Sequence, residues 1–194
     1  MVPNFVGESN LLIGDEGMSS FKLIAGSCAD QEADVIVNAA NDGLKAGGGI
    51  CGVIFSKAGV AELTAECNKH QTPLNDGDAV ITSSCKMTNC KEIIHAVGPN
   101  FAVKPKAFKE LFEAYYNSLK VLMDNGYHSI SFPLISSGSF GGNLDNPVAE
   151  SVKQACRAYK KFIEDYPDYE VEVLLCAYGR DEYGKALEEM KNWN

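Results

Sequence analysis

Short apolar runs alternate along this chain with longer segments of helical periodicity, and this alternation restricts the fold to one class. Residues 35–37 are apolar at every position, as is typical of a strand that is buried on both faces of a sheet. One helical face is formed by Phe108, Leu111, Phe112, Tyr115, Leu119 and Leu122. Because strands that alternate with helices form mostly parallel sheets, the sequence predicts an α/β domain whose sites lie in loops after the carboxyl ends of strands.

The chain is expected to form one domain over residues 21–194, preceded by a loosely tied arm or edge element over residues 1–20. Strands are expected at residues 21–25, 35–37, 79–82, 93–97, 129–133 and 171–176. Helices are expected at residues 50–58, 60–70 and 181–193, from near Pro105 to a stop at Asn125, and from the Asn146 cap and Pro147 onward.

The composition excludes several classes of protein. The net charge is −9, from 26 acidic and 17 basic residues, whereas a nucleic-acid footprint needs a basic face. No run of about 18 apolar residues is present, and the N-terminal residues lack the basic start and apolar centre of a signal peptide, so we expect no membrane span. Seven scattered cysteines, an odd number, favour a reducing, cytoplasmic setting over a disulfide framework.

A first glycine loop, residues 41–49, follows the buried strand. Asn38 and Asn41 lie where the strand ends, and their amides can orient hydroxyl groups. The loop closes with three consecutive glycines, Gly47, Gly48 and Gly49. Glycines let backbone N–H groups approach a ligand and a helix N-terminus favours an anion, so this loop can bind a diphosphate without Lys or Arg. A tight strand-to-helix turn with structural caps is the alternative interpretation.

A second glycine loop, residues 136–142, follows the strand at 129–133. It consists of Ser136, Ser137, Gly138, Ser139, Phe140, Gly141 and Gly142. Small residues in series can form a concave nest of N–H groups, over which Phe140 can pack against a ligand. A flexible connection to the next helix is the alternative, but two such loops at the same sheet edge favour a ligand site.

Three segments together resemble the motifs of the macro domain family. Asn38-Ala39-Ala40-Asn41, with Leu44 and the three glycines, resembles the family's first ligand loop. Residues 94–99, Ile-His-Ala-Val-Gly-Pro, resemble its central segment, and residues 133–141 resemble its second, phosphate-binding loop. The motifs occur in the family's order, and the resemblance spans about residues 21 to 191.

This resemblance implies a three-layer α/β/α sandwich with a mixed, mostly parallel sheet that binds ADP-ribose. It also implies hydrolysis of mono-ADP-ribose esters on protein acidic side chains, with mono-ADP-ribosylated proteins as partners and no metal or cofactor. A non-catalytic ADP-ribose reader is the alternative. The implied catalytic residues are Asn41, Gly48 and Gly49. The implied ligand contacts are Ser27, Cys28, Asn38, Gly47, Ile50, Cys51, Ser136, Ser137, Gly138, Ser139, Phe140 and Tyr178.

Two positions depart from the family pattern. Ser27 stands where many members have an aspartate that accepts a hydrogen bond from the adenine amine; Asp30 or Asp34 is a candidate to compensate. Cys51 stands where characterised hydrolases have an aspartate that helps activate water. A thiol in the first turn of a helix can have a lowered pKa and act as a nucleophile, but we expect Cys51 to have a packing role.

Other residue patterns carry weaker alternatives. Cys67 with His70, and Cys85 with Cys90, have loose zinc-ligand spacings, and we expect no zinc site. His95 lies in an apolar run and is expected to be a core histidine bonded to the backbone. A nucleotide-dependent oxidoreductase is a third hypothesis, disfavoured because the chain lacks a Gly-x-Gly-x-x-Gly turn followed by an acid.

Overall fold

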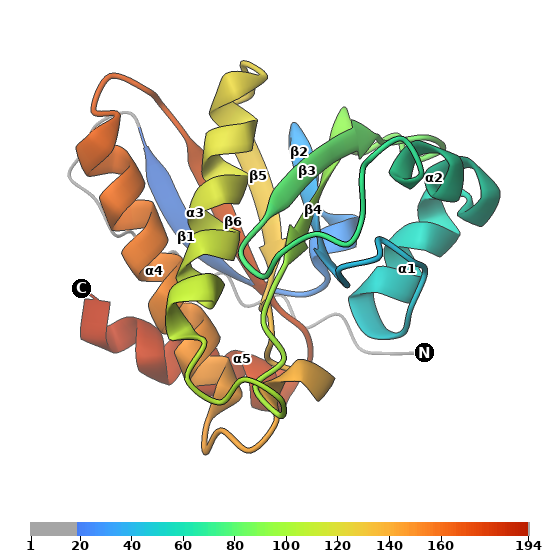
Figure 1. The fold of residues 1–194 in the computed structure, drawn as a ribbon. Coiled ribbons are helices and arrows are strands. Elements are labelled where there is room, and N and C mark those ends of the chain that lie inside the picture. Colours follow the sequence, from blue (N-terminus) through green and yellow to red (C-terminus); the bar gives the residue numbers. More distant parts are fainter. Residues whose placement is uncertain (1–18, 194) are drawn as a thin grey trace.

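A computed structural model describes residues 19–193, in which the chain forms a six-stranded sheet (Figure 1). The strands are β1 (Ser20–Ala25), β2 (Val35–Ala40), β3 (Ala79–Ser83), β4 (Glu92–Val97), β5 (Ser129–Pro133) and β6 (Glu172–Ala177). Their order across the sheet is β1-β6-β5-β2-β4-β3. All neighbouring pairs are parallel except β3 and β4, so the sheet is mixed and mostly parallel, as predicted.

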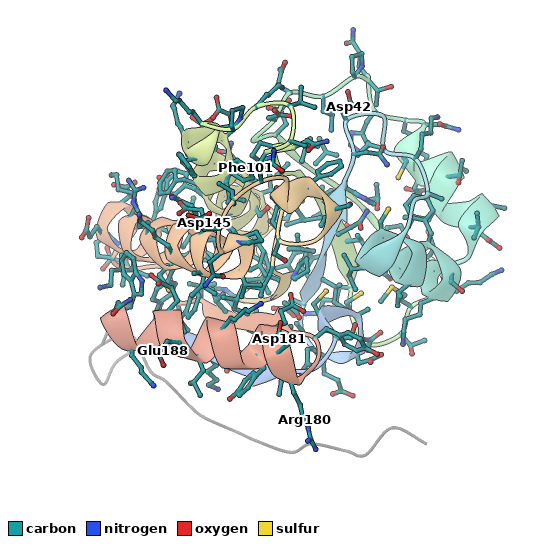
Figure 2. The ribbon with its side chains drawn as sticks, turned by 90° about the horizontal axis from the view of Figure 1, so that it is seen from below. Asp42, Phe101, Asp145, Arg180, Asp181 and Glu188 are labelled. Atoms are coloured by element: carbon teal, nitrogen blue, oxygen red, sulfur yellow. The ribbon has the colours of Figure 1, made fainter. Side chains whose placement is uncertain are left out.

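Helices cover both faces of this sheet. One layer holds α1 (Gly49–Ala58) and α2 (Val60–Cys67), and the other holds α3 (Phe108–Asp124), α4 (Pro147–Asp165) and α5 (Arg180–Met190). Figures 1 and 2 show the two layers on opposite sides of the strands. The three-layer α/β/α fold is therefore confirmed.

The period of two along β2 assigns its side chains to the two layers. Val35 and Val37 join the core beneath α3, α4 and α5, whereas Ile36 joins the core beneath α1 and α2. All three are fully buried, as the apolar run predicted. Asn38 follows in the same alternation and lies opposite His95 of β4, which places it on the α1 side.

Several element boundaries differ from those expected, including those of three helices. The helix expected at 60–70 ends at Cys67, because Lys69 and His70 donate N–H groups to carbonyls three residues back and form a turn. The helix expected from near Pro105 begins at Phe108, after a turn in which Ala107 donates to Lys104. The last helix begins at Arg180 and continues past Met190 as a 3-10 turn.

The arm expected at residues 1–20 lies outside the described residues except for its end, where Ser20 already belongs to β1. Within residues 19–193, no helix is long and apolar enough to span a membrane. The carboxyl ends of β1, β2, β5 and β6 meet at one edge of the sheet, where a short 3-10 turn η1 (Cys28–Asp30) and both glycine loops follow them.

Candidate functional site

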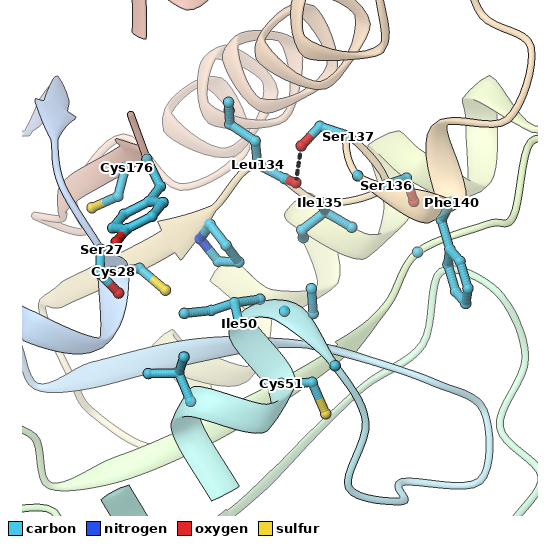
Figure 3. Close-up of a pocket in the computed structure, with 18 of the residues that line it drawn as sticks. Ser27, Cys28, Ile50, Cys51, Leu134, Ile135, Ser136, Ser137, Phe140 and Cys176 are labelled. Carbon is cyan, nitrogen blue, oxygen red and sulfur yellow. Dashed lines mark hydrogen bonds between the residues drawn. The ribbon is translucent and has the colours of Figure 1, made fainter. Parts of the chain in front are cut away.

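A cavity of about 920 Å³ opens at this edge, between the two glycine loops (Figure 3). Its wall includes every residue to which the resemblance gave a catalytic or ligand-binding role, except Asn38. These are Ser27, Cys28, Asn41, Gly47, Gly48, Gly49, Ile50, Cys51, Ser136, Ser137, Gly138, Ser139, Phe140 and Tyr178. The cavity is large enough for a dinucleotide-sized ligand.

Asn41 fixes the shape of the first loop. Its Oδ1 accepts the Lys45 N–H at 2.9 Å, and its Nδ2 donates to the Lys45 carbonyl at 2.8 Å. An amide oxygen has two lone pairs and an amide nitrogen has two hydrogens, so Asn41 keeps one of each for a ligand. Asn41 therefore shapes the loop and can still contact a molecule in the cavity.

The first loop delivers the N-terminus of α1 to the cavity. Gly48 is the N-cap and has no side chain to accept the helix's first N–H groups, which are left for a ligand. Gly49 has a φ of +59°, a left-handed conformation that favours glycine. A Cβ at Gly52 would lie 2.6 Å from the Gly47 carbonyl oxygen, so the helix and loop approach as closely as glycine allows. The arrangement presents backbone donors to an anion.

A buried network of hydrogen-bonded side chains lies beneath the first loop, and the sequence predicted it only in part. Asn38 is 1% exposed and sits under the loop rather than in the cavity wall, because its place in β2 turns it toward α1. Its Nδ2 lies 3.1 Å from His95 Nδ1 and 3.7 Å from Cys51 Sγ. Thr82 Oγ1 lies 2.9 Å from His95 Nε2. His95 thus bonds side chains, and the expected bond to the backbone is wrong.

These contacts assign the tautomer of His95. Because the Asn38 amide N–H donates to Nδ1, the imidazole proton lies on Nε2 and is donated to Thr82 Oγ1. Burial lowers the pKa of His95 to about 4, in agreement with a neutral ring. His95 and Asn38 therefore form a rigid, uncharged support for the first loop.

Cys51 joins this support to the loop. It is 6% exposed, and its Sγ donates to the Lys45 carbonyl at 3.6 Å while accepting from Asn38. The Lys45 carbonyl belongs to the first loop, and Asn38 lies beneath that loop. Among the described residues, no histidine contacts the thiol. These contacts favour the expected packing role over a nucleophilic one.

The second loop is held in place by its own hydroxyl groups and by the loop after β4. Ser136 has a φ of +58°, and its Oγ donates to the Pro99 carbonyl at 2.7 Å. Ser137 Oγ donates to the Leu134 carbonyl at 2.8 Å, as Figure 3 shows. Phe101 N–H donates to the Phe140 carbonyl. A Cβ at Gly98 would collide with Ile135 and Ser136, so the central segment packs directly against this loop.

The η1 end of the cavity is lined by sulfur and a hydroxyl. Figure 3 shows Ser27, Cys28 and Cys176 grouped at this end. Burial raises the pKa of both Cys28 and Cys176, the latter to about 12, so both are neutral thiols. Ser27 Oγ accepts the Ala29 N–H at 3.2 Å and caps η1. A flat, weakly polar group suits this end.

The structure separates the two aspartates that were candidates to compensate for Ser27. Asp30 lines the cavity and pairs with Lys57 at 2.7 Å. Asp34 precedes β2, at the opposite edge of the sheet, and accepts N–H groups from His128 and Ser129. Asp34 therefore cannot reach the cavity, and Asp30 is the aspartate near Ser27.

Sequence reasoning missed several wall residues, of which Glu182 has the most chemical significance. It lies in the first turn of α5 and is half-buried. Its Oε2 accepts the Tyr178 N–H at 3.0 Å, and its Oε1 lies 3.5 Å from Ser137 Oγ. A sequence signal existed, because a glutamate three residues after the Gly179 cap is a common capping position.

The zinc spacings do not converge on a site. Within residues 19–193, no group of three His, Cys, Asp or Glu side chains is arranged to hold a metal ion. His70 Nε2 instead bonds the Ile81 carbonyl at 3.0 Å. All seven cysteines are free thiols.

The fold and the two glycine loops define a class, and sequence comparison names it: the chain belongs to the macro domain family, whose model matches residues 37–161. It is 36% identical to a Klebsiella pneumoniae protein named O-acetyl-ADP-ribose deacetylase, over 80% of this chain and 87% of that protein. It is 32% identical to rat ADP-ribose glycohydrolase MACROD1, over 88% of this chain and 64% of that protein. The Oceanobacillus iheyensis macrodomain solved with ADP superposes with a TM-score of 0.82 at 28% identity, over 92% of this chain and 94% of that one.

Proposed function

We propose that this protein binds ADP-ribose and hydrolyses the ester that joins its distal ribose to an acidic side chain of a protein. The observation that carries the proposal is the meeting of the uncapped α1 N-terminus and the second loop in one cavity. Relatives named for ADP-ribose chemistry and a neighbour solved with ADP support the same ligand.

The charge of the cavity wall determines how a diphosphate would bind. Among the described wall residues, Lys57 is the only cation, and it is paired with Asp30. The diphosphate is therefore held by backbone N–H groups of α1 and the second loop. We expect micromolar affinity, about −7 to −9 kcal/mol, with little dependence on salt.

The distal ribose lies at the first loop. Asn41 orients its hydroxyl groups with the amide atoms that Lys45 leaves free. A Cβ at Gly48 would meet nothing within 4 Å, so this position is open to the acceptor chain and a water. Water cleaves the ester, releasing ADP-ribose and the acidic side chain of the protein.

No acidic side chain lines this end of the cavity within the described residues. The wall carboxylates are Asp30, the last residue of η1, and Glu182, which bonds the Tyr178 N–H. We infer that the bound diphosphate polarises the water and that positioning supplies most of the rate. Turnover is therefore slow.

A non-catalytic reader is the second candidate, and Cys51 is the observation that favours it. Its thiol donates to the Lys45 carbonyl, so it cannot serve as a carboxylate base would. Binding of ADP-ribose without turnover would establish that function. Both candidate functions imply that the partners are mono-ADP-ribosylated proteins. The seven free thiols support a reducing, cytoplasmic location.

The test is a single-turnover reaction with a protein modified on glutamate and labelled in its ADP-ribose. We expect loss of label from the protein and release of free ADP-ribose. Gly48→Val keeps an allowed backbone but fills the open space, so it should abolish cleavage and spare most binding of free ADP-ribose. Gly184→Ala, also open but on α5 outside the cavity wall, is the matched control. Tight ADP-ribose binding with no release by the wild type would refute the hydrolase.

A further inference from the structure

Glu182 holds a carboxylate between two parts of the cavity. On one side its Oε2 accepts the N–H of Tyr178, whose side chain is 72% exposed at the cavity mouth. On the other side its Oε1 faces the hydroxyl of Ser137 in the second loop at 3.5 Å. The carboxylate thus lies between the η1 end of the cavity and the second loop.

This carboxylate keeps unused acceptor capacity. Ser137 has one hydroxyl proton, and its shorter bond, 2.8 Å, is to the Leu134 carbonyl. Each carboxylate oxygen can accept two hydrogen bonds. Burial raises the pKa of Glu182, so its ionised form gains from any further donor that a ligand supplies.

The position of Glu182 indicates which part of the proposed ligand would lie beside its carboxylate. In ADP-ribose, the group between adenine and the diphosphate is a ribose with two adjacent hydroxyl groups. A phosphate beside Glu182 would be repelled, whereas a hydroxyl is a donor that a carboxylate binds well. In dinucleotide-binding folds, an acidic residue makes this contact to a ribose hydroxyl and disfavours a phosphate at that position.

We propose that Glu182 recognises the hydroxyl edge of the adenosine ribose and excludes ligands that are phosphorylated there. This inference rests on the proposed binding of ADP-ribose. It makes Glu182 a specificity-determining residue that separates ADP-ribose derived from NAD from its 2′-phosphorylated counterpart derived from NADP.

Calorimetry with paired ligands tests the inference. The wild type should bind ADP-ribose about 10²-fold more tightly than 2′-phospho-ADP-ribose, since like charges placed together cost several kcal/mol. Glu182→Gln keeps an acceptor oxygen and removes the charge, so the ratio should fall by about tenfold or more. Asp181→Asn removes the same charge one residue away, at the start of α5 (labelled in Figure 2). Asp181 pairs with Lys185 and is not part of the cavity wall, so this change should leave the ratio unchanged.

A second pair of ligands isolates the hydrogen bond. The wild type should prefer ADP to 2′,3′-dideoxy-ADP by about tenfold, and Glu182→Ala should lose most of that preference. Ratios of affinities are insensitive to a general loosening of α5, and thermal melting of each variant without ligand confirms that it is folded.

The outcomes separate the inference from the function on which it rests. Unchanged ratios in both Glu182 variants, with ADP-ribose still bound, would overturn the inference alone. No binding of ADP-ribose by the folded wild type would overturn both. The ratio of affinities for ADP-ribose and 2′-phospho-ADP-ribose could also change equally in Asp181→Asn and Glu182→Gln. That result would assign the effect to net charge and overturn the role of Glu182.

Discussion

Replacement of Asn41 by alanine should separate catalysis from binding. The Asn41 amide makes two hydrogen bonds to the Lys45 backbone, of 2.8 and 2.9 Å, in a partly exposed loop. A net worth of about 0.5–1.5 kcal/mol per bond gives a loss of about 1–2 kcal/mol of stability for the variant at this exposed site. The same change frees the first loop and removes the amide that we propose to orient the distal ribose.

Misplacement of reacting groups by about 1 Å can cost about 10² in rate, so the single-turnover rate of Asn41→Ala should fall by at least this factor. The affinity for free ADP-ribose should fall by less, about tenfold or below, because the backbone donors of α1 are unchanged. Rate, calorimetric affinity and thermal melting should be measured on the same preparation.

Lys45→Ala is the matched control for this experiment. The two hydrogen bonds of the Asn41 amide go to the backbone of Lys45, which alanine also has, so the loop should keep its shape. The lysine side chain itself reaches Asn68, outside the cavity wall. We therefore expect a rate within about twofold of the wild type. An Asn41→Ala rate within tenfold of the wild type, or an equal loss in Lys45→Ala, would refute the assigned role.

Three further predictions follow from neighbouring residues. Cys51→Ala should retain most of the hydrolase activity. Cys51→Asp should raise the rate about 10²-fold if the new carboxylate reaches the water. Loss of activity in Cys51→Ala at unchanged affinity for ADP-ribose would indicate thiol chemistry. Ser27→Asp keeps the η1 cap and adds a charged acceptor, so calorimetry should show tighter ADP-ribose binding, and unchanged or weaker binding would mean that Ser27 does not contact adenine. His95 has a pKa of about 4 when folded against about 6.5 when unfolded, so the unfolded chain binds more protons between these values. The contribution of His95 to stability should be constant above pH 6.5 and fall by up to about 3 kcal/mol toward pH 4 in denaturant titrations, and His95→Gln should remove this part of the pH dependence. An unchanged pH profile in that variant would contradict the prediction.

The sequence predicted the layers and both loops because these depend on local patterns. The apolar run at residues 35–37 and the alternation of elements predict a parallel sheet covered on both faces. The parallel order then brings the loops after β2 and β5 to one edge. Glycine-rich composition was sufficient to identify both loops as parts of one site.

Contacts between distant elements could not be predicted in the same way. Glu182 reaches the cavity only because α5 starts beside the second loop, and its partner Ser137 lies 45 residues away. Asn38 was expected to contact the ligand because of its motif. The strand's period of two instead places its side chain beneath the first loop, on the α1 face of the sheet. Counting from the buried Val37 would have placed Asn38 on the α1 face, beside His95.

The two ends of the cavity together favour one orientation of ADP-ribose in the proposed complex. The end near Cys28 and Cys176 is lined by these two buried, neutral thiols, which suit a flat base, and Asp30 in its wall is paired with Lys57. The end at Gly48 is exposed and open, so an acceptor protein can enter there. Glu182 stands between them and accepts hydroxyl donors, while the α1 N-terminus offers donors to the diphosphate. A reversed ligand would place the ester against the buried thiols and leave it out of reach of Asn41, so the proposed binding and the proposed cleavage share a single orientation.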